Sequence, residues 1–182
     1  MSTDPFELVD AITRKEQELH ELRRELACLH RRSSLPSTEF VALRCRLHGY
    51  AVALIAQELH EVVRMAELLV LPDSPTWLMG LLALGPRRIP VLDLLARDAG
   101  VRRSPAPNEF VVIAETEAGP CGLLMEAIEG LVTVAPSQIS RPERDAPFGA
   151  HVLGIVSIGD EAVLLLSAAP ATLENVGLAG TA

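Results

Sequence analysis

The hydrophobic period of the chain changes near residue 33, and this change restricts the possible folds more than any other feature. Residues 5–32 contain no glycine and repeat apolar positions at helical spacing, whereas short apolar stretches alternate with turns beyond residue 38. A polar break containing Ser33, Ser34 and Pro36 separates the two patterns. The sequence therefore predicts a long N-terminal α-helix followed by a mainly β body.

The predicted helix over residues 5–32 carries a narrow apolar strip. Asp4 before Pro5 is typical of a helix start, with an N-cap residue followed by proline in the first turn. A heptad frame interrupted by Lys15 places six apolar residues at positions a and d: Leu8, Ile12, Leu19, Leu22, Leu26 and Leu29. A strip this narrow favours a partner helix, so the segment is a candidate coiled coil for self-association. Packing of the same residues on the chain's own body is the alternative.

The body is predicted to consist of many short strands. They are expected at Phe40–Leu47, Tyr50–Ile55, Leu59–Arg64, Arg87–Leu94, Phe110–Ala114, Cys121–Ile128, Leu131–Val134, Val152–Ile158 and Ala162–Leu166. Tight turns at 48–49 and 159–160 would close hairpins. Short strands at this spacing, without long helices between them, predict barrels or sandwiches. We expect a first unit over 38–101 and a second over 109–175, packed together.

Two brief helices are expected inside the first unit. Ser74 can cap a helix that carries Trp77, Leu78, Leu81 and Leu82, and Asp93 can begin another that Gly100 ends. Pro90 lies within a predicted strand, which indicates an edge strand or a bulge, because proline cannot donate a backbone hydrogen bond.

Composition and charge restrict the partners. A net charge of −8 and only 3% aromatic residues disfavour binding to nucleic acid. Asp4, Glu7 and Asp10 lie among the first ten residues, where a signal peptide would be apolar. Leu68–Leu84 is the most apolar stretch, but Pro72 and Pro75 interrupt it and it is too short to span a membrane. We therefore expect a cytoplasmic protein without membrane insertion, with its three scattered cysteines reduced: Cys28, Cys45 and Cys121.

The sequence contains no arrangement of residues typical of catalysis or of a metal site. It has no glycine-rich phosphate-binding loop. Cys45 and His48 lie three positions apart on a predicted strand, so their side chains point to opposite faces. Ser157 within Gly154–Gly159 matches a nucleophile elbow only loosely. We therefore expect a binding module without catalytic residues, metal or cofactor.

The order of several apolar segments resembles a known family. The segments are Phe40–Leu43, Gly49–Leu54, Leu59–Arg64, Trp77–Gly80, Ile89–Leu94, Cys121–Ile128 and Val152–Ile155. In this order and spacing they resemble the CheW-like domain of bacterial chemotaxis coupling proteins, over roughly residues 38–175. The resemblance implies two five-stranded SH3-like barrels packed together. It also implies a non-catalytic adaptor that couples a CheA-type histidine kinase to methyl-accepting chemoreceptors.

The resemblance also indicates where partners bind. The strand that carries Glu61, Val62, Val63 and Arg64 contributes to a partner surface in the family. The segment from Gly80 to Arg88 is expected to decide which partner is bound. There the family commonly has asparagine, arginine and glycine, whereas this chain has Ala83, Gly85 and Pro86, with Arg87 and Arg88 as the nearest cations.

Because of this departure, we expect altered partner specificity. One alternative is a specialised scaffold or localisation factor that keeps the CheW-like fold but no longer joins receptor arrays. Another is a domain that binds a small ligand, or acts on one, in the cleft between the barrels.

Overall fold

The computed structural model describes residues 14–15, 35–99, 104–116, 119–142 and 146–168. The chain divides into two compact units, Met1–Leu35 and Pro36–Ala182. Within the first unit only Arg14 and Lys15 of the predicted helix are described, and both are helical. The predicted coiled-coil positions lie outside the described residues: Leu8, Ile12, Leu19, Leu22, Leu26 and Leu29. The coiled coil and self-association through it stay predictions.

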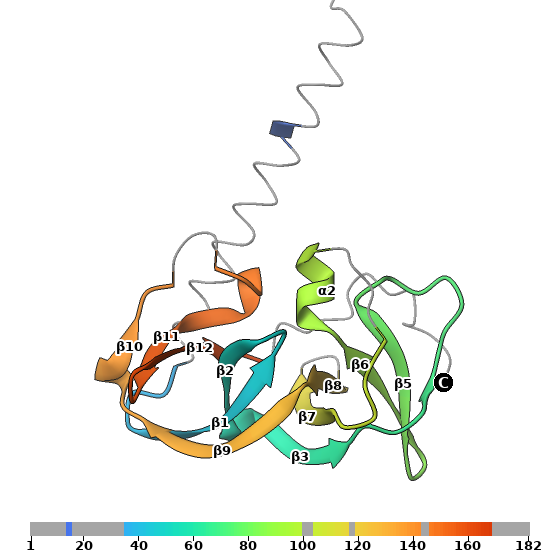
Figure 1. The fold of residues 1–182 in the computed structure, drawn as a ribbon, viewed down its shortest axis with the longest axis horizontal. Coiled ribbons are helices and arrows are strands. Elements are labelled where there is room, and N and C mark those ends of the chain that lie inside the picture. The colour runs from blue at the N-terminus through green and yellow to red at the C-terminus, as the bar shows by residue number, and fades with distance from the viewer. Residues whose placement is uncertain (1–13, 16–34, 100–103, 117–118, 143–145, 169–182) are drawn as a thin grey trace, which may run out of the picture. The chain divides into compact units, whose positions relative to one another are not determined.

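Within its described residues, the second unit is a pair of six-stranded sheets (Figure 1). Sheet A contains, in spatial order, β10 (Ile139–Ser140), β11 (Val152–Ile158), β12 (Glu161–Leu166), β2 (Tyr50–Ile55), β1 (Phe40–Leu47) and β9 (Ala127–Val134). Sheet B contains β3 (Leu59–Arg64), β7 (Phe110–Thr116), β8 (Gly119–Met125), β6 (Arg87–Leu92), β5 (Leu78–Leu84) and β4 (Leu68–Leu69). The short helices are α2 (Leu94–Ala99), η1 (Ala56–Glu58), η2 (Pro136–Gln138) and η3 (Gly149–His151).

The two halves of the body repeat one plan and exchange their first hairpins. Each half contains a hairpin, a single strand, a two-residue strand and a second hairpin: β1–β2, β3, β4 and β5–β6, then β7–β8, β9, β10 and β11–β12. The β1–β2 hairpin joins the strands of the second half through parallel pairing of β2 with β12. The β7–β8 hairpin joins the strands of the first half through parallel pairing of β8 with β6.

The exchange of hairpins corrects two expectations. The predicted five-stranded closed barrels are wrong, because each sheet has six strands and its two end strands are not paired with each other. Neither sheet coincides with the predicted unit 38–101 or 109–175, since each takes strands from both sides of residues 102–108. Pairing between strands distant in sequence leaves no local pattern that could reveal this exchange.

The structure also differs from two local predictions made for the first half of the body. Leu78, Leu81 and Leu82, which were predicted to lie in a short helix capped by Ser74, belong to β5, which pairs with both β4 and β6. A nearly continuous apolar run fits a buried strand as well as a helix. Pro90 is not on an edge strand, because β6 pairs with β5 and β8. The pairing with β8 begins at Val91, one residue later, so Pro90 does not have to donate a hydrogen bond there.

The β1–β2 turn and the start of α2 form as expected and contact each other. His48 and Gly49 both have positive φ, at 50° and 77°, as a two-residue hairpin turn requires. The buried carboxylate of Asp93 accepts hydrogen bonds from the backbone N–H groups of Leu95 and Ala96, at 3.1 and 3.2 Å. His48 Nε2 lies 2.8 Å from the same carboxylate. This contact ties the first hairpin of sheet A to the end of β6 in sheet B.

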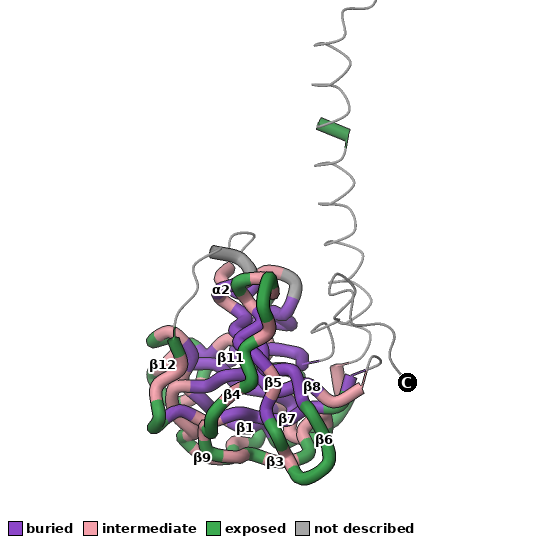
Figure 2. The backbone as a smooth tube through the Cα atoms, turned by 90° about the vertical axis from the view of Figure 1, so that its right-hand side faces the viewer, coloured by how far each residue is buried: buried purple, intermediate pink, exposed green. Residues whose placement is uncertain are grey.

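The core lies between and within the sheets (Figure 2). One cluster contains buried residues of both sheets, among them Leu47, Val52, Leu92, Val112 and Leu123. A second cluster belongs to sheet B: Met79, Leu82, Ile89, Val91, Val111, Ile113 and Leu124. Among the described residues no helix combines the length and apolar character needed to cross a membrane.

Candidate partner-binding surface

β3 is an end strand of sheet B and presents alternate residues outward. Among the described strands it pairs only with β7. Val62 and Arg64 are exposed, whereas Glu61 and Val63 are half-buried. Val63 packs against the sheet B core and therefore fixes the position of the strand. The side chains available to a partner are those of Glu61, Val62 and Arg64.

Arg64 is held above a neighbouring ring. Its guanidinium carbon lies 5.2 Å from the ring centroid of Phe110, its cross-strand partner on β7. A cation over an aromatic face is stabilised by the ring quadrupole while it stays accessible to solvent. The strand therefore presents an exposed valine next to an oriented guanidinium group.

The β5–β6 hairpin presents the second predicted segment. Leu84 pairs with Arg87, so Gly85 and Pro86 form a two-residue turn, and Gly85 has a φ of 58°. Glycine as the first central residue suits this turn, because a left-handed φ strains other residues. Ala83 pairs directly with Arg88, and both are exposed. Arg88 therefore places a guanidinium group beside Ala83 on the same face of the hairpin.

An ion pair brings the two segments together. Arg87 Nη2 lies 3.2 Å from Glu61 Oε1, and the two side chains are 55% and 40% exposed. A pair this exposed contributes at most about 1 kcal/mol, so it orients the groups more than it stabilises the fold. We call the resulting region the sheet B surface: Glu61, Val62, Arg64, Ala83, Gly85, Arg87 and Arg88.

Arg88 contacts backbone carbonyls of its own hairpin. Its Nη1 donates to Gly85 O at 3.3 Å and to Arg87 O at 3.2 Å. No carboxylate among the described residues pairs with it. A guanidinium group held in this way has further donors that suit a carboxylate of a partner.

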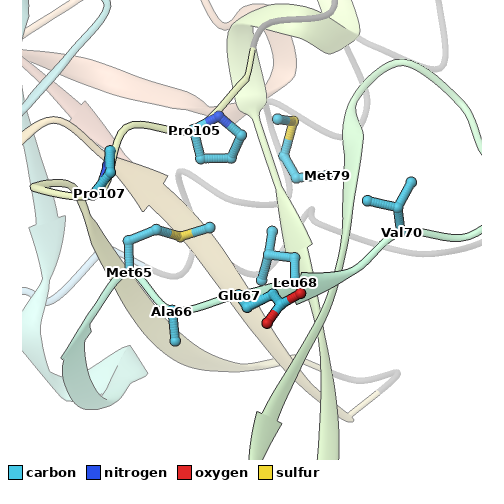
Figure 3. A pocket seen from close by; sticks show the side chains of 8 residues that line it. All are labelled: Met65, Ala66, Glu67, Leu68, Val70, Met79, Pro105 and Pro107. Carbon is cyan, nitrogen blue, oxygen red and sulfur yellow. The ribbon is translucent and has the colours of Figure 1, made fainter.

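A groove close to this surface was not expected from the sequence. Its volume is about 380 Å³, and it is lined by Met65, Ala66, Glu67, Leu68, Val70, Met79, Pro105 and Pro107 (Figure 3). Leu69 and Val70 are 60% and 58% exposed. Buried Glu109 holds the proline segment, because its carboxylate accepts a hydrogen bond from Ala106 N at 2.9 Å. The flexible side chains of Met65 and Met79 can adapt to an apolar residue of a partner.

The only sequence signal for the groove is the pair of prolines between the two predicted units, Pro105 and Pro107. The lining of the groove comes from residues 65–68 and 70, Met79, Pro105 and Pro107, and the pairing of β3 with β7 brings the first and last of these segments together. Met65 N donates to Glu109 O at 2.9 Å and extends this pairing beyond β3. The groove is therefore a product of tertiary pairing.

Sheet A carries a different arrangement of charges, in which the cations and carboxylates pair with each other. Arg44 and Arg46 on β1 both contact Glu129 of β9 and Glu161 of β12. The hydrogen bond from Arg46, with the positive charges of both arginines, lowers the pKa of the Glu129 carboxyl. We call these four residues the sheet A cluster.

The two cysteines among the described residues are buried. Cys45 and Cys121 are free thiols, and burial raises the pKa of each to about 12. In the described ranges, no three His, Cys, Asp or Glu side chains gather as a metal site would require.

Comparisons with known proteins agree with the fold. A family model described as the CheW-like domain matches residues 41–176. The chain is 22% identical over 128 residues to the chemotaxis protein CheW of Thermotoga maritima, covering 70% of this chain and 84% of that protein. It is 24% identical over 96 residues to the probable chemotaxis protein CheW of Rhizobium etli, covering 53% and 61%.

A solved structure has the same fold. The crystal structure of the scaffolding protein TtCheW from Thermoanaerobacter tengcongensis matches with a TM-score of 0.65 and 22% identity. The match covers 74% of this chain and 87% of that chain. The resemblance seen in the apolar segments is thereby confirmed, since the family model spans most of the β body. The chain belongs to the CheW-like domain family.

Proposed function

We propose that this chain is a non-catalytic adaptor of bacterial chemosensory signalling that acts in the cytoplasm. In this proposal it couples a CheA-type histidine kinase to methyl-accepting chemoreceptors through the sheet B surface. Membership of the CheW-like domain family supports the proposal. Two matched proteins are named as chemotaxis proteins and a third as a scaffolding protein.

The observation that carries the proposal is the contact between Glu61 and Arg87. It joins β3, which carries exposed Val62 and Arg64, to the β5–β6 hairpin, which carries exposed Arg88. Protein interfaces commonly combine an apolar centre with a polar rim and are rich in arginine. The adjoining apolar groove, with exposed Leu69 and Val70, would extend the area available to a partner.

We further propose that the hairpin alters partner specificity. Ala83 and Gly85 have no polar side chain, and the directed donors on this face come from Arg88 across the strand pair. A guanidinium group placed on β6 reaches a different point than one placed on β5 or in the turn. A partner carboxylate complementary to Arg88 would therefore be selected.

The test is affinity capture from a lysate of the source cells. The full chain is compared with Arg88→Glu and with Arg141→Glu, which makes the same charge change at an exposed residue beyond β10. We expect the full chain and Arg141→Glu to capture a CheA-type kinase or a chemoreceptor, and Arg88→Glu to capture at least about tenfold less.

Two results would contradict the proposal. Capture of neither protein class by a folded bait would favour the alternative of a specialised scaffold outside receptor arrays. Equal capture by Arg88→Glu would exclude the hairpin from the interface while leaving the adaptor function intact.

A further inference from the structure

β9 forms an unpaired edge of sheet A. Among the described strands its only partner is β1, and Figure 1 shows it along the outside of the sheet. Leu131 in the middle of β9 is 68% exposed, and Val41 on the adjacent strand is 41% exposed. An apolar strand with a free edge offers backbone N–H and C=O groups to which another chain can add a strand.

The charges near this edge are neutralised within the chain. The register between β1 and β9 shifts between Arg44 and Cys45, which makes Glu129 the extra residue of a bulge. Its carboxylate contacts Arg44 and Arg46 in the sheet A cluster. Beyond the bulge, Gly130–Val134 contains no charged residue and no proline. Beyond the bulge, the edge therefore lacks the charged residues and proline that usually prevent strand addition.

We propose that the β9 edge pairs with β9 of a second copy of this chain, antiparallel and about a twofold axis at Val132. In this register Val132 faces the same residue of the second copy, Leu131 faces Thr133, and Gly130 faces Val134. Every residue that faces another is uncharged, and cross-strand pairs of β-branched residues stabilise sheets. A twofold arrangement uses each edge once, so it closes as a dimer with one continuous sheet.

The corresponding edge of sheet B explains why the second copy is expected at β9. β3 occupies the equivalent place, and exposed Arg64 stands where β9 has Thr133. A charged residue on an edge strand disfavours strand addition. The β3 edge thus carries a charge that disfavours strand addition. The β9 edge places only uncharged residues opposite the same edge of a second copy. The inference concerns sheet A alone and does not depend on the proposed adaptor function.

Analytical ultracentrifugation tests the proposal in the full chain carrying Leu22→Asp, which removes any coiled-coil association. We expect a monomer–dimer equilibrium between low and high micromolar concentration. Adding Leu131→Lys should raise the dissociation constant at least about tenfold, because a charge would be placed at the uncharged pairing. Adding Val62→Lys, the matched change at the equivalent exposed position on β3, should leave it unchanged.

Three results would overturn the proposal: a Leu22→Asp chain that stays monomeric, a dimer that persists in Leu131→Lys, and equal weakening by Val62→Lys. Circular dichroism checks that each variant is folded.

A cross-linking experiment tests the register. Chains with Cys28→Ser carry either Leu131→Cys or Thr133→Cys and are treated with a short bismaleimide. Because Leu131 faces Thr133 of the second copy, the mixture should give more cross-linked dimer than either chain alone. Equal yields in the three samples would exclude the axis at Val132.

Discussion

Sheets A and B follow the same plan but differ in how their charges are used. Each has a bulge on the longer of its two edge strands, at Glu129 in β9 and at His60 in β3. Glu129 pairs with Arg46 on the adjacent strand, and His60 Nε2 lies 3.0 Å from Glu115 at the equivalent position of sheet B. The same backbone site therefore carries a polar pair in each sheet, with the carboxylate on the bulged strand in sheet A and on the neighbouring strand in sheet B.

Beyond these pairs the sheets diverge. In sheet A, Arg44 and Glu161 extend the pair to a cluster of two cations and two carboxylates. In sheet B the position of Arg44 is taken by buried Ile113, and the position of Glu161, at the start of the last strand, is taken by Arg87. Arg87 pairs with Glu61 instead.

The charges of sheet A therefore stabilise the fold, whereas those of sheet B are available to a partner. In sheet A equal numbers of guanidinium and carboxylate groups satisfy each other, and this leaves an apolar edge. In sheet B three arginines accompany one carboxylate in the sheet B surface, so donors are left for a second molecule. The two sheets therefore suit two kinds of contact, an apolar strand edge and a cationic surface.

The largest effect is expected for a property that the two sheets share, the low reactivity of their buried cysteine thiols. Cys45 of sheet A and Cys121 of sheet B both have a pKa raised from 9.0 to about 12 by burial. The thiolate fraction at neutral pH is then lower by about a thousandfold. In the Cys28→Ser chain, a chromogenic disulfide reagent should react with neither thiol until urea unfolds the protein. Rapid labelling of only one would show that its sheet opens locally.

Two glycines at equivalent positions, Gly80 in β5 and Gly154 in β11, allow the packing of the two sheets to be compared. A Cβ on Gly80 would lie 2.7 Å from the Leu69 carbonyl oxygen, and Gly80 also has a φ of +146°. A Cβ on Gly154 would lie 2.9 Å from the Ser140 carbonyl oxygen, without a left-handed φ. In urea unfolding we expect Gly80→Ala to cost about 4 kcal/mol and Gly154→Ala about 2 kcal/mol.

Gly130→Ala is the control for backbone strain. Gly130 has a φ of +134°, and a Cβ there would meet nothing within 4 Å. Strain alone should cost about 1 kcal/mol. If Gly80→Ala costs no more than Gly130→Ala, the two-residue strand β4 does not pack against β5 as described.

Removing one arginine from each sheet tests the contrast in charges directly. Arg44 contacts two carboxylates and is 23% exposed, so Arg44→Ala should lower the free energy of unfolding by about 1–2 kcal/mol. Arg87 makes one pair and is 55% exposed, so Arg87→Ala should cost less than about 0.5 kcal/mol. Equal losses in urea titrations would contradict the assignment of the sheet A cluster as structural.

The smallest effect is a pH dependence at acid pH. The lowered pKa of Glu129 means that the unfolded chain binds its proton more tightly. Its contribution to stability is therefore present above the unfolded pKa and is lost as the pH falls through the lowered value. Glu129→Gln should reduce the loss of stability between about pH 5 and pH 3, measured by thermal unfolding.

The pKa of the Glu58 carboxyl is shifted in the opposite direction to that of Glu129. Burial raises the pKa of its carboxyl, which accepts hydrogen bonds from Ala168 N at 3.0 Å and Ser167 Oγ at 3.3 Å. The folded chain binds this proton more tightly, so its contribution to stability rises as the pH falls through the raised pKa. Glu58→Gln should therefore steepen the acid loss. The same direction of change in both variants would contradict these pKa assignments.

Local patterns predicted much of the strand content. β1, β2 and β3 begin and end at the predicted residues, because alternation and the 48–49 turn act within short segments. The start of α2 was predicted from Asp93, whose carboxylate caps the helix. The short helix predicted to carry Leu78, Leu81 and Leu82 was wrong, because these leucines fit both periods and only pairing with β4 and β6 selects the strand.

The mainly β body, the family resemblance and the segments proposed for the candidate surface could all be predicted from the sequence. Those features depend on composition, turns and spacing along the chain. Only the tertiary structure decided the exchange of hairpins, the ion pair between Glu61 and Arg87, and the placement of Arg88 beside Ala83. Each depends on pairing between residues distant in sequence or on the exact register of two strands. Such pairing is selected by the packing of the whole core, which no local pattern records.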